Sequence, residues 1–85
     1  MAESVRVAAV VVTYDALPWI ENCLDSLAGV ETVVVDNGSG DGTVPFVRER
    51  YPDVRLVESE NRGLGAGWNL GTRATTSTYV LLLNA

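Results

Sequence analysis

The sequence predicts an α/β fold in which a parallel sheet carries helices on both faces. Short runs rich in valine and leucine alternate with stretches whose apolar residues recur at helical spacing. The runs favour strands and the helical period favours helices. Their alternation is typical of a parallel sheet with right-handed crossovers. The stretch 33–43 adds a third observation, because three valines lead directly into Asp36 and a glycine-rich turn.

Four strands and three helices are expected from these patterns. Strands are predicted at residues 5–12, 31–35, 54–57 and 79–83, and helices at 17–27, from near 41 or 43 to about 51, and at 64–74. The first strand is a nearly continuous apolar run, which suits burial on both faces. Either Asp41 or Thr43 is a candidate N-cap of the second helix, and the sequence does not choose between them. The third helix contains several glycines, each of which costs roughly 1 kcal/mol in a helix interior.

The 85 residues suffice for one small domain. A formal net charge of −5 argues against a duplex nucleic-acid partner, whose phosphates must be met by basic side chains. No apolar run approaches the roughly 20 residues of a transmembrane helix, and no secretory signal is recognisable. The cytoplasm is therefore the expected location, with membrane association left open for a full-length protein.

The chain has no histidine and no lysine, and Cys23 is its only cysteine. Ser-His-Asp and Cys-His catalysis, histidine metal sites, Schiff-base chemistry and the P-loop lysine are therefore excluded within it. Carboxylates, arginines, hydroxyls and backbone amides are the groups that remain for chemistry.

Polar residues follow the first two predicted strands: Thr13, Tyr14 and Asp15 after the first, and Asp36 and Asn37 after the second. Ligands bind beyond the carboxyl ends of strands in open α/β sheets, so these residues should lie together at such an edge. A turn explains Asn37, whereas an acid directly after three valines needs a partner for its charge, which favours a binding role for Asp36. Tyr14 could stack on a planar ring. Asp15 fits a ligand role and a helix N-terminal acid about equally.

The glycine cluster at 63–67 does not match the dinucleotide-binding pattern Gly-x-Gly-x-x-Gly. Trp68 replaces its last glycine when the count starts at Gly63, and the cluster follows the third strand rather than the first. An NAD or FAD site is therefore not expected. Trp19 and Trp68 are expected to serve in packing, and Arg62 is expected to be an exposed arginine.

Four segments stand out in order along the chain. They are Val-Val-Val-Thr-Tyr-Asp at 10–15, Val-Val-Asp-Asn-Gly-Ser-Gly-Asp-Gly-Thr at 34–43, Glu-Asn-Arg-Gly-Leu-Gly-Ala-Gly-Trp-Asn-Leu-Gly at 60–71, and Tyr-Val-Leu-Leu-Leu-Asn at 79–84. Together they resemble the N-terminal, nucleotide-sugar-binding part of a family 2 glycosyltransferase with the GT-A fold. Asp15 departs from the family pattern, in which asparagine is usual. Each segment alone is a weak signal, but four in the same order and spacing are a strong one.

The resemblance implies a three-layer, Rossmann-like sheet of about four strands in the order 3-2-1-4, which is a partial GT-A fold. It also implies that residues of this chain bind a nucleoside-diphosphate sugar. Asp36 would hydrogen-bond the base or ribose, and the segment containing Asn61 and Gly63 would close the other side of the pocket. The expected substrate-binding residues are Thr13, Tyr14, Asp15, Asp36, Asn37, Asn61 and Gly63.

The family uses Mg²⁺ or Mn²⁺ at the diphosphate, and an aspartate farther along the chain as the base that activates the acceptor hydroxyl. Asn84 lies where the Asp-x-Asp-like metal motif would begin, and the motif is incomplete here. No catalytic residue is therefore expected within the chain. We expect residues 1–85 to be a single, truncated donor-binding half, inactive alone and without a bound metal.

The expected function is thus that of an inverting glycosyltransferase, which moves a sugar from a nucleoside-diphosphate sugar to an acceptor hydroxyl. A non-catalytic nucleotide-binding or interaction remnant is the main alternative. A flavodoxin-like or receiver-type domain is a weaker one, because the chain lacks lysine and a phosphate loop after the first strand. In the implied strand order, the last strand leaves an apolar edge unpaired, and this edge predicts self-association.

Overall fold

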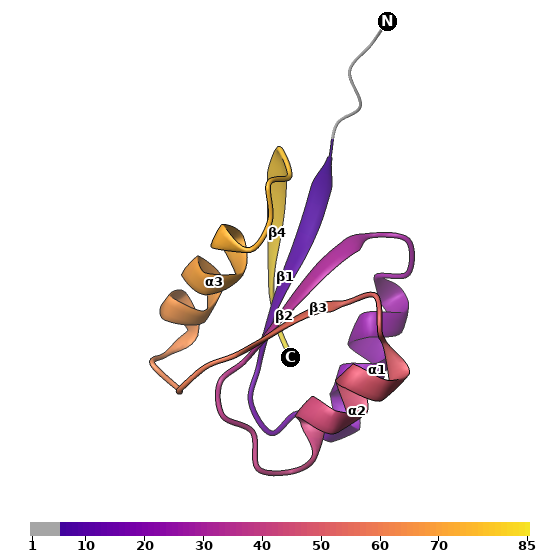
Figure 1. The fold of residues 1–85 in the computed structure, drawn as a ribbon, viewed down its shortest axis with the longest axis vertical. Coiled ribbons are helices and arrows are strands. Elements are labelled where there is room, and N and C mark those ends of the chain that lie inside the picture. The colour runs from indigo at the N-terminus through magenta and orange to yellow at the C-terminus, as the bar shows by residue number, and fades with distance from the viewer. Residues whose placement is uncertain (1–5) are drawn as a thin grey trace, which may run out of the picture.

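The computed structural model describes residues 6–85 and confirms the predicted order of strands and helices (Figure 1). The elements are β1 (Val7–Thr13), α1 (Leu17–Ser26), β2 (Glu31–Asp36), α2 (Thr43–Arg50), β3 (Arg55–Glu58), α3 (Leu64–Arg73) and β4 (Tyr79–Asn84). Most bounds lie within one or two residues of the expected ones. The expected start of the first strand, Val5, lies outside the described residues.

The four strands form one sheet in the order β3-β2-β1-β4, with every pair parallel. This confirms the predicted order. Val11 of β1 lies opposite Val34 of β2 and Leu83 of β4. In this register the carboxyl ends of the three strands lie at the same edge of the sheet. Within the described chain, β4 pairs only with β1 and is an edge strand.

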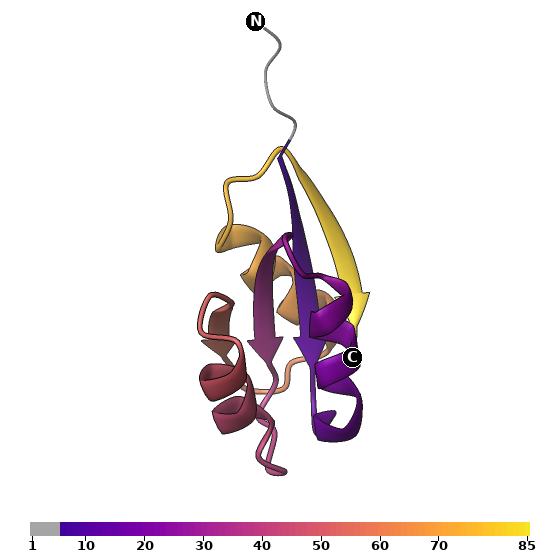
Figure 2. The ribbon, with the colours of Figure 1, turned by 90° about the vertical axis from the view of Figure 1, so that its right-hand side faces the viewer.

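Helices cover both faces of the sheet. Figures 1 and 2 show α1 and α2 on one face and α3 on the other. The first layer buries Val11 and Val34 against Ile20, Leu24 and Val47. The second layer is formed by the alternate residues of the same strands, Val10, Val12, Val33 and Val35, with Leu64 and Trp68 from α3 packed against them. Burial on both faces is the reason that the central strands are continuous apolar runs.

Two glycines of α3 let this helix lie close to β1. A Cβ built on Gly67 would meet Val12 at 2.9 Å, and one on Gly71 would come still closer to Cγ1 of Val10. Both glycines are buried, whereas Gly65 of the same helix is exposed. The glycines at 67 and 71 therefore serve helix–sheet packing.

Two local expectations were wrong. The N-cap of α2 is neither Asp41 nor Thr43 but Gly42, whose φ of 92° is readily adopted by glycine. Trp19 is 65% exposed, because it lies on the face of α1 opposite to the buried Ile20 and Leu24. Trp68 packs as predicted, and its indole N–H donates to the carbonyl of Leu83 at 3.1 Å.

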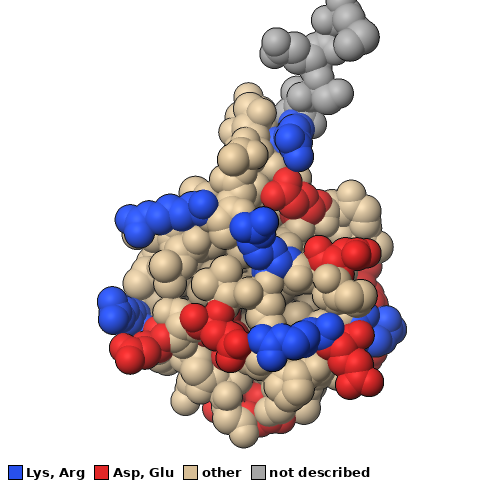
Figure 3. Space-filling model, in the orientation of Figure 1, with Lys and Arg blue, Asp and Glu red and all other residues tan. Residues whose placement is uncertain are grey.

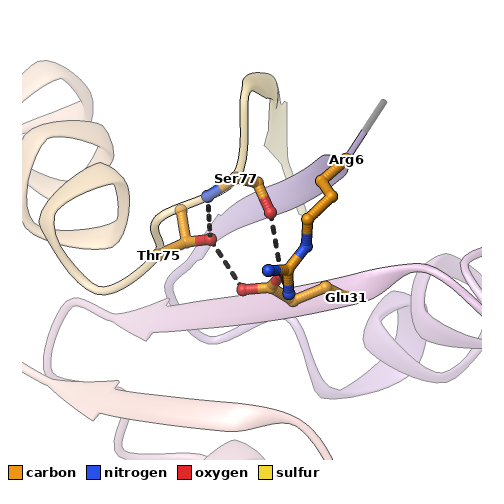
Figure 4. A network of polar contacts seen from close by, with 4 residues as sticks. All are labelled: Arg6, Glu31, Thr75 and Ser77. Atoms are coloured by element: carbon orange, nitrogen blue, oxygen red, sulfur yellow. Dashed lines mark hydrogen bonds and ion pairs between the residues drawn. The ribbon is translucent and has the colours of Figure 1, made fainter. Parts of the chain in front are cut away.

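A polar cluster fastens the connection between α3 and β4 to the start of β2 (Figure 4). The Glu31 carboxylate accepts hydrogen bonds from the hydroxyls of Thr75 at 2.6 Å and Ser77 at 2.8 Å. Arg6 lies 3.8 Å from the same carboxylate. The Thr75 and Ser77 hydroxyls lower the pKa of Glu31 because they stabilise its charged form.

Acidic and basic side chains are interspersed on the face shown in Figure 3. Arg48 pairs with Glu58 at 2.8 Å, and both side chains are more than half exposed. Exposed pairs of this kind contribute little to stability, so the fold depends mainly on its two apolar layers. No helix within residues 6–85 is both long enough and apolar enough to span a membrane.

Candidate functional site

The carboxyl ends of β1 and β2 bring the predicted polar residues together. Thr13 lies opposite Asp36 in the parallel register, and the N–H of Asn37 donates to the carbonyl of Thr13 at 2.9 Å. This confirms that Thr13 to Asp15 lie beside Asp36. The Thr13 side chain is fully buried, and its hydroxyl has no hydrogen-bond partner within residues 6–85.

Asp36 is only 2% exposed, and its carboxylate is held by its own loop. Oδ2 accepts the N–H of Gly38 at 3.1 Å and the N–H of Ser39 at 2.8 Å, and Oδ1 accepts the Ser39 hydroxyl at 2.5 Å. These charge-assisted bonds offset the cost of burying the acid after three valines. An ionised carboxylate has about four acceptor positions, so one remains on Oδ1.

Asp15 connects the β1 end to the loop that follows β2. Its backbone has a φ of 48°, in the left-handed region that Asp and Asn tolerate better than most residues. Its N–H donates to the Ser39 hydroxyl at 2.8 Å, and its Oδ1 accepts the N–H of Gly40 at 2.7 Å. The side chain therefore contacts the neighbouring loop and not the N-terminus of α1.

Asp41, and not Asp15, is the acid whose carboxylate accepts a hydrogen bond from the N-terminus of α1. Its Oδ2 accepts the N–H of Leu17 at 3.1 Å, while Oδ1 accepts the N–H of Thr43 at 3.1 Å and the Thr43 hydroxyl at 2.5 Å. The Thr43 hydroxyl, with the two backbone donors, lowers the pKa of Asp41. The contact of Asp41 with Leu17 was not predicted from the sequence, whereas Asp-x-Thr after a turn is a common local hydrogen-bonding pattern.

The other predicted ligand residues lie at or near this edge. The Tyr14 side chain is 52% exposed. Asn37 is 5% exposed, lies against α3 at Gly67, and its side chain makes no hydrogen bond with the described residues. Asn61 accepts the N–H of Gly63 at 3.1 Å, and Gly63 has a φ of 92°.

The segment that leads to α3 starts from the same edge. The N–H of Ser59 donates to the carbonyl of Asp36 at 2.8 Å. Arg62 is exposed, as predicted, and pairs with Glu60 at 3.5 Å. The structure thus brings β1, β2 and the start of the α3 segment to one edge.

The predicted metal ligand, Asn84, ends β4 opposite Val12. Residues 6–85 contain no cluster of three or more His, Cys, Asp or Glu side chains that could hold a metal ion. Mg²⁺ prefers six oxygen ligands, usually including carboxylates, and one amide does not provide such a set. The residues present do not fit a metal site by themselves, and the role of Asn84 stays a prediction.

A hollow of about 430 Å³ lies at the opposite edge, beside the first residues of β2 and β3. Leu24, Leu27 and Val54 contribute its apolar lining. Two charged residues of its lining are already engaged, Arg50 with Glu21 at 3.6 Å and Glu31 with the hydroxyls of the α3–β4 connection. The edge bearing Asp36 has the stronger case, because buried polar groups converge at the carboxyl ends of its strands.

The chain is similar in sequence and in fold to several known proteins. A family model described as glycosyl transferase family 2 matches residues 8–85. EpsH of Bacillus subtilis, which its name describes as a glycosyltransferase, is 28% identical over 98% of this chain and 26% of EpsH. The N-acetylglucosaminyl-diphospho-decaprenol L-rhamnosyltransferase of Mycobacterium tuberculosis is 41% identical over 71% of this chain and 22% of that protein.

The crystal structure of S. aureus TarS 1-349 shares the fold, with a TM-score of 0.82 and 25% sequence identity. The likeness covers 93% of this chain and 27% of TarS. The chain thus spans about a quarter of the length of the relatives named above.

Proposed function

Because the chain belongs to glycosyl transferase family 2, we propose that it is the donor-binding part of an inverting glycosyltransferase. The reaction would transfer a sugar from a nucleoside-diphosphate sugar to an acceptor hydroxyl. The acceptor and the catalytic base would be bound or provided by residues beyond those of this chain. We further propose that this activity takes place in the cytoplasm. Family membership sets aside the flavodoxin-like alternative.

The observation that carries the proposal is the convergence of polar side chains at the carboxyl ends of β1 and β2. Tyr14 is half exposed there and offers a ring face to a base. Asp36 keeps one acceptor position for an N–H or O–H of the base or ribose. The Asn37 amide has both donor and acceptor capacity free of other described residues.

The diphosphate would lie away from these carboxylates. Asp15 and Asp36 already accept the N–H groups of residues 38–40, so this loop offers few donors to an anion. The N-terminus of α3 has no side-chain cap, and Gly63 before it has open space around its Cα. Free N–H groups at a helix N-terminus favour a phosphate, so the sugar diphosphate would point from Asp36 toward α3.

Calorimetric titration of the 85-residue chain with UDP, GDP, CDP and dTDP tests this proposal. We expect saturable binding of at least one of them, and its loss in Asp36→Ala. Asp53→Ala is the control, because it removes an exposed acid at the opposite edge of the sheet and leaves the Asp36 edge unchanged. Tyr14→Ala serves as the second test if Asp36→Ala does not fold by circular dichroism. Failure of all four nucleotides to bind, or binding unchanged in both Asp36→Ala and Tyr14→Ala, would contradict the proposal.

We further propose that the chain self-associates through β4. Among the strands of residues 6–85, β4 is paired on one side only, and Tyr79, Leu81 and Leu82 are 60%, 49% and 44% exposed. A second copy could place its own β4 antiparallel to the first, which satisfies the free backbone groups of both under two-fold symmetry.

A further inference from the structure

We propose that Asp15 is a positioning residue that fixes Tyr14 at the nucleotide pocket and does not itself contact the donor. The inference rests on the proposed function, which supplies the pocket. It assigns Asp15 a role different from that of Asp36, although the two acids lie at the ends of neighbouring strands.

The contacts of Asp15 form a reciprocal clasp between the β1 end and the β2–α2 loop. The Asp15 N–H donates to the Ser39 hydroxyl, and the Asp15 carboxylate accepts the N–H of Gly40. The Ser39 hydroxyl in turn donates to Oδ1 of Asp36. A hydroxyl that accepts one hydrogen bond and donates the next polarises both, which strengthens the chain of bonds.

The clasp fixes the backbone on the C-terminal side of Tyr14. On the N-terminal side, the carbonyl of Thr13 accepts the N–H of Asn37 at 2.9 Å. Tyr14 is therefore held between two attachments to the same loop, while the residue stays 52% exposed. The backbone on both sides, and hence the clasp, sets the position of this half-exposed residue.

The clasp needs an acceptor oxygen and a left-handed backbone, and it does not need a charge. Asparagine has the same Oδ1 acceptor and shares the tolerance of aspartate for a φ near the observed 48°. Alanine has no acceptor, and its Cβ disfavours this φ. A residue that bound the donor through its charge would not tolerate asparagine, whereas one that bound it through an acceptor oxygen would. The asparagine variant therefore tests the charge, and the double variant with Tyr14 tests direct contact.

The test combines amide exchange with nucleotide titration of the full 85-residue chain. The variants are Asp15→Asn, Asp15→Ala, Tyr14→Ala and the double variant Asp15→Ala/Tyr14→Ala. Asp53→Ala is the control, since it removes an exposed acid at the opposite edge of the sheet. Exchange of the Gly40 amide is measured without nucleotide, and UDP, GDP, CDP and dTDP are the probes of affinity.

In Asp15→Ala, we expect Gly40 exchange to accelerate about tenfold, as for the loss of one hydrogen bond. Nucleotide affinity should fall about tenfold in Asp15→Ala and in Tyr14→Ala, as for the loss of one stacked base. The double variant should bind no more weakly than Tyr14→Ala, because Asp15 acts through that ring. Asp15→Asn should match the unchanged chain in both measurements.

Additive losses in the double variant, or equal losses in Asp15→Asn and Asp15→Ala, would overturn the proposal in favour of direct donor contact. Unchanged Gly40 exchange in Asp15→Ala would overturn the clasp. If the unchanged chain binds none of the four nucleotides, the proposed function fails and the positioning of Tyr14 for a nucleotide fails with it. The exchange result is still decisive for the clasp in that case.

Discussion

Asp41 links two helix N-termini that are far apart in the sequence. Its carboxylate accepts from Leu17 at the start of α1 and from Thr43 at the start of α2. Both helix starts are electropositive, so a negative charge is favoured there. The lowered pKa of Asp41 reflects these partners and ties the stability of this loop to pH.

The stability contributed by Asp41 should be lost in acid. Because its folded-state pKa is lowered, the contribution is present above the unfolded pKa of about 4 and disappears as the pH falls through the folded value. We expect the midpoint temperature of thermal unfolding to fall more steeply between about pH 5 and pH 2 in the unchanged chain than in Asp41→Asn. Circular dichroism melts across this range measure the difference, and parallel curves would contradict it.

The roles of Asp15 and Asp41 show where residue-level prediction from the sequence ends. The sequence indicated that Asp15 lies at the polar edge, and it gave Asp41 as a candidate N-cap of the second helix. Asp15 was considered for the N-terminus of α1 and Asp41 for that of α2. Asp41 does accept from Thr43 at the start of α2, but the contacts of Asp15 with Gly40 and of Asp41 with Leu17 were not expected. These partners are 25 and 24 residues away, and capping rules consider only neighbours along the chain.

At the scale of elements, α3 depends on two glycines for its distance from the sheet. Gly71→Ala should destabilise the fold by about 1–3 kcal/mol, because its Cβ would overlap Val10, a fully buried, β-branched side chain. Gly65→Ala is the matched control in the same helix, where the new Cβ meets open space. This control should gain about 0.5–1 kcal/mol.

Chemical denaturation of Gly71→Ala and Gly65→Ala measures their free energies of unfolding. Equal changes at the two positions would contradict the close packing of α3 on β1. The sequence predicted α3 and, through the resemblance, placed the segment with Gly63 at the ligand pocket, but it gave Gly67 and Gly71 no packing role. Gly67 and Gly71 instead face the valines of β1. Glycine spacing of this kind cannot tell a ligand from a packed strand, because both require the absence of a Cβ.

At the scale of the molecule, the strand order and the two layers follow from features that the sequence contains. Continuous valine runs predicted central strands, and the alternation with helices predicted parallel pairing. The position of β4 beside β1 came from the resemblance to a family, since apolar patterns do not specify which strands are neighbours. The exposure of Trp19 was missed because tryptophan is highly buried on average, although Trp19 lies outside the helical series of Leu17, Ile20, Leu24 and Leu27.

The edge of β4, which is unpaired within residues 6–85, is the basis for the proposed self-association of the molecule. We expect the average mass of the unchanged chain in sedimentation velocity to rise with concentration, and Leu81→Lys to stay monomeric because a lysine on an edge strand opposes pairing. Trp19→Lys is the control, since it adds the same charge at another exposed apolar residue. The strand is only six residues long, so the interface should be small and the association weak. A monodisperse monomer for the unchanged chain, or equal loss of association in both lysine variants, would show that the β4 edge is not the contact.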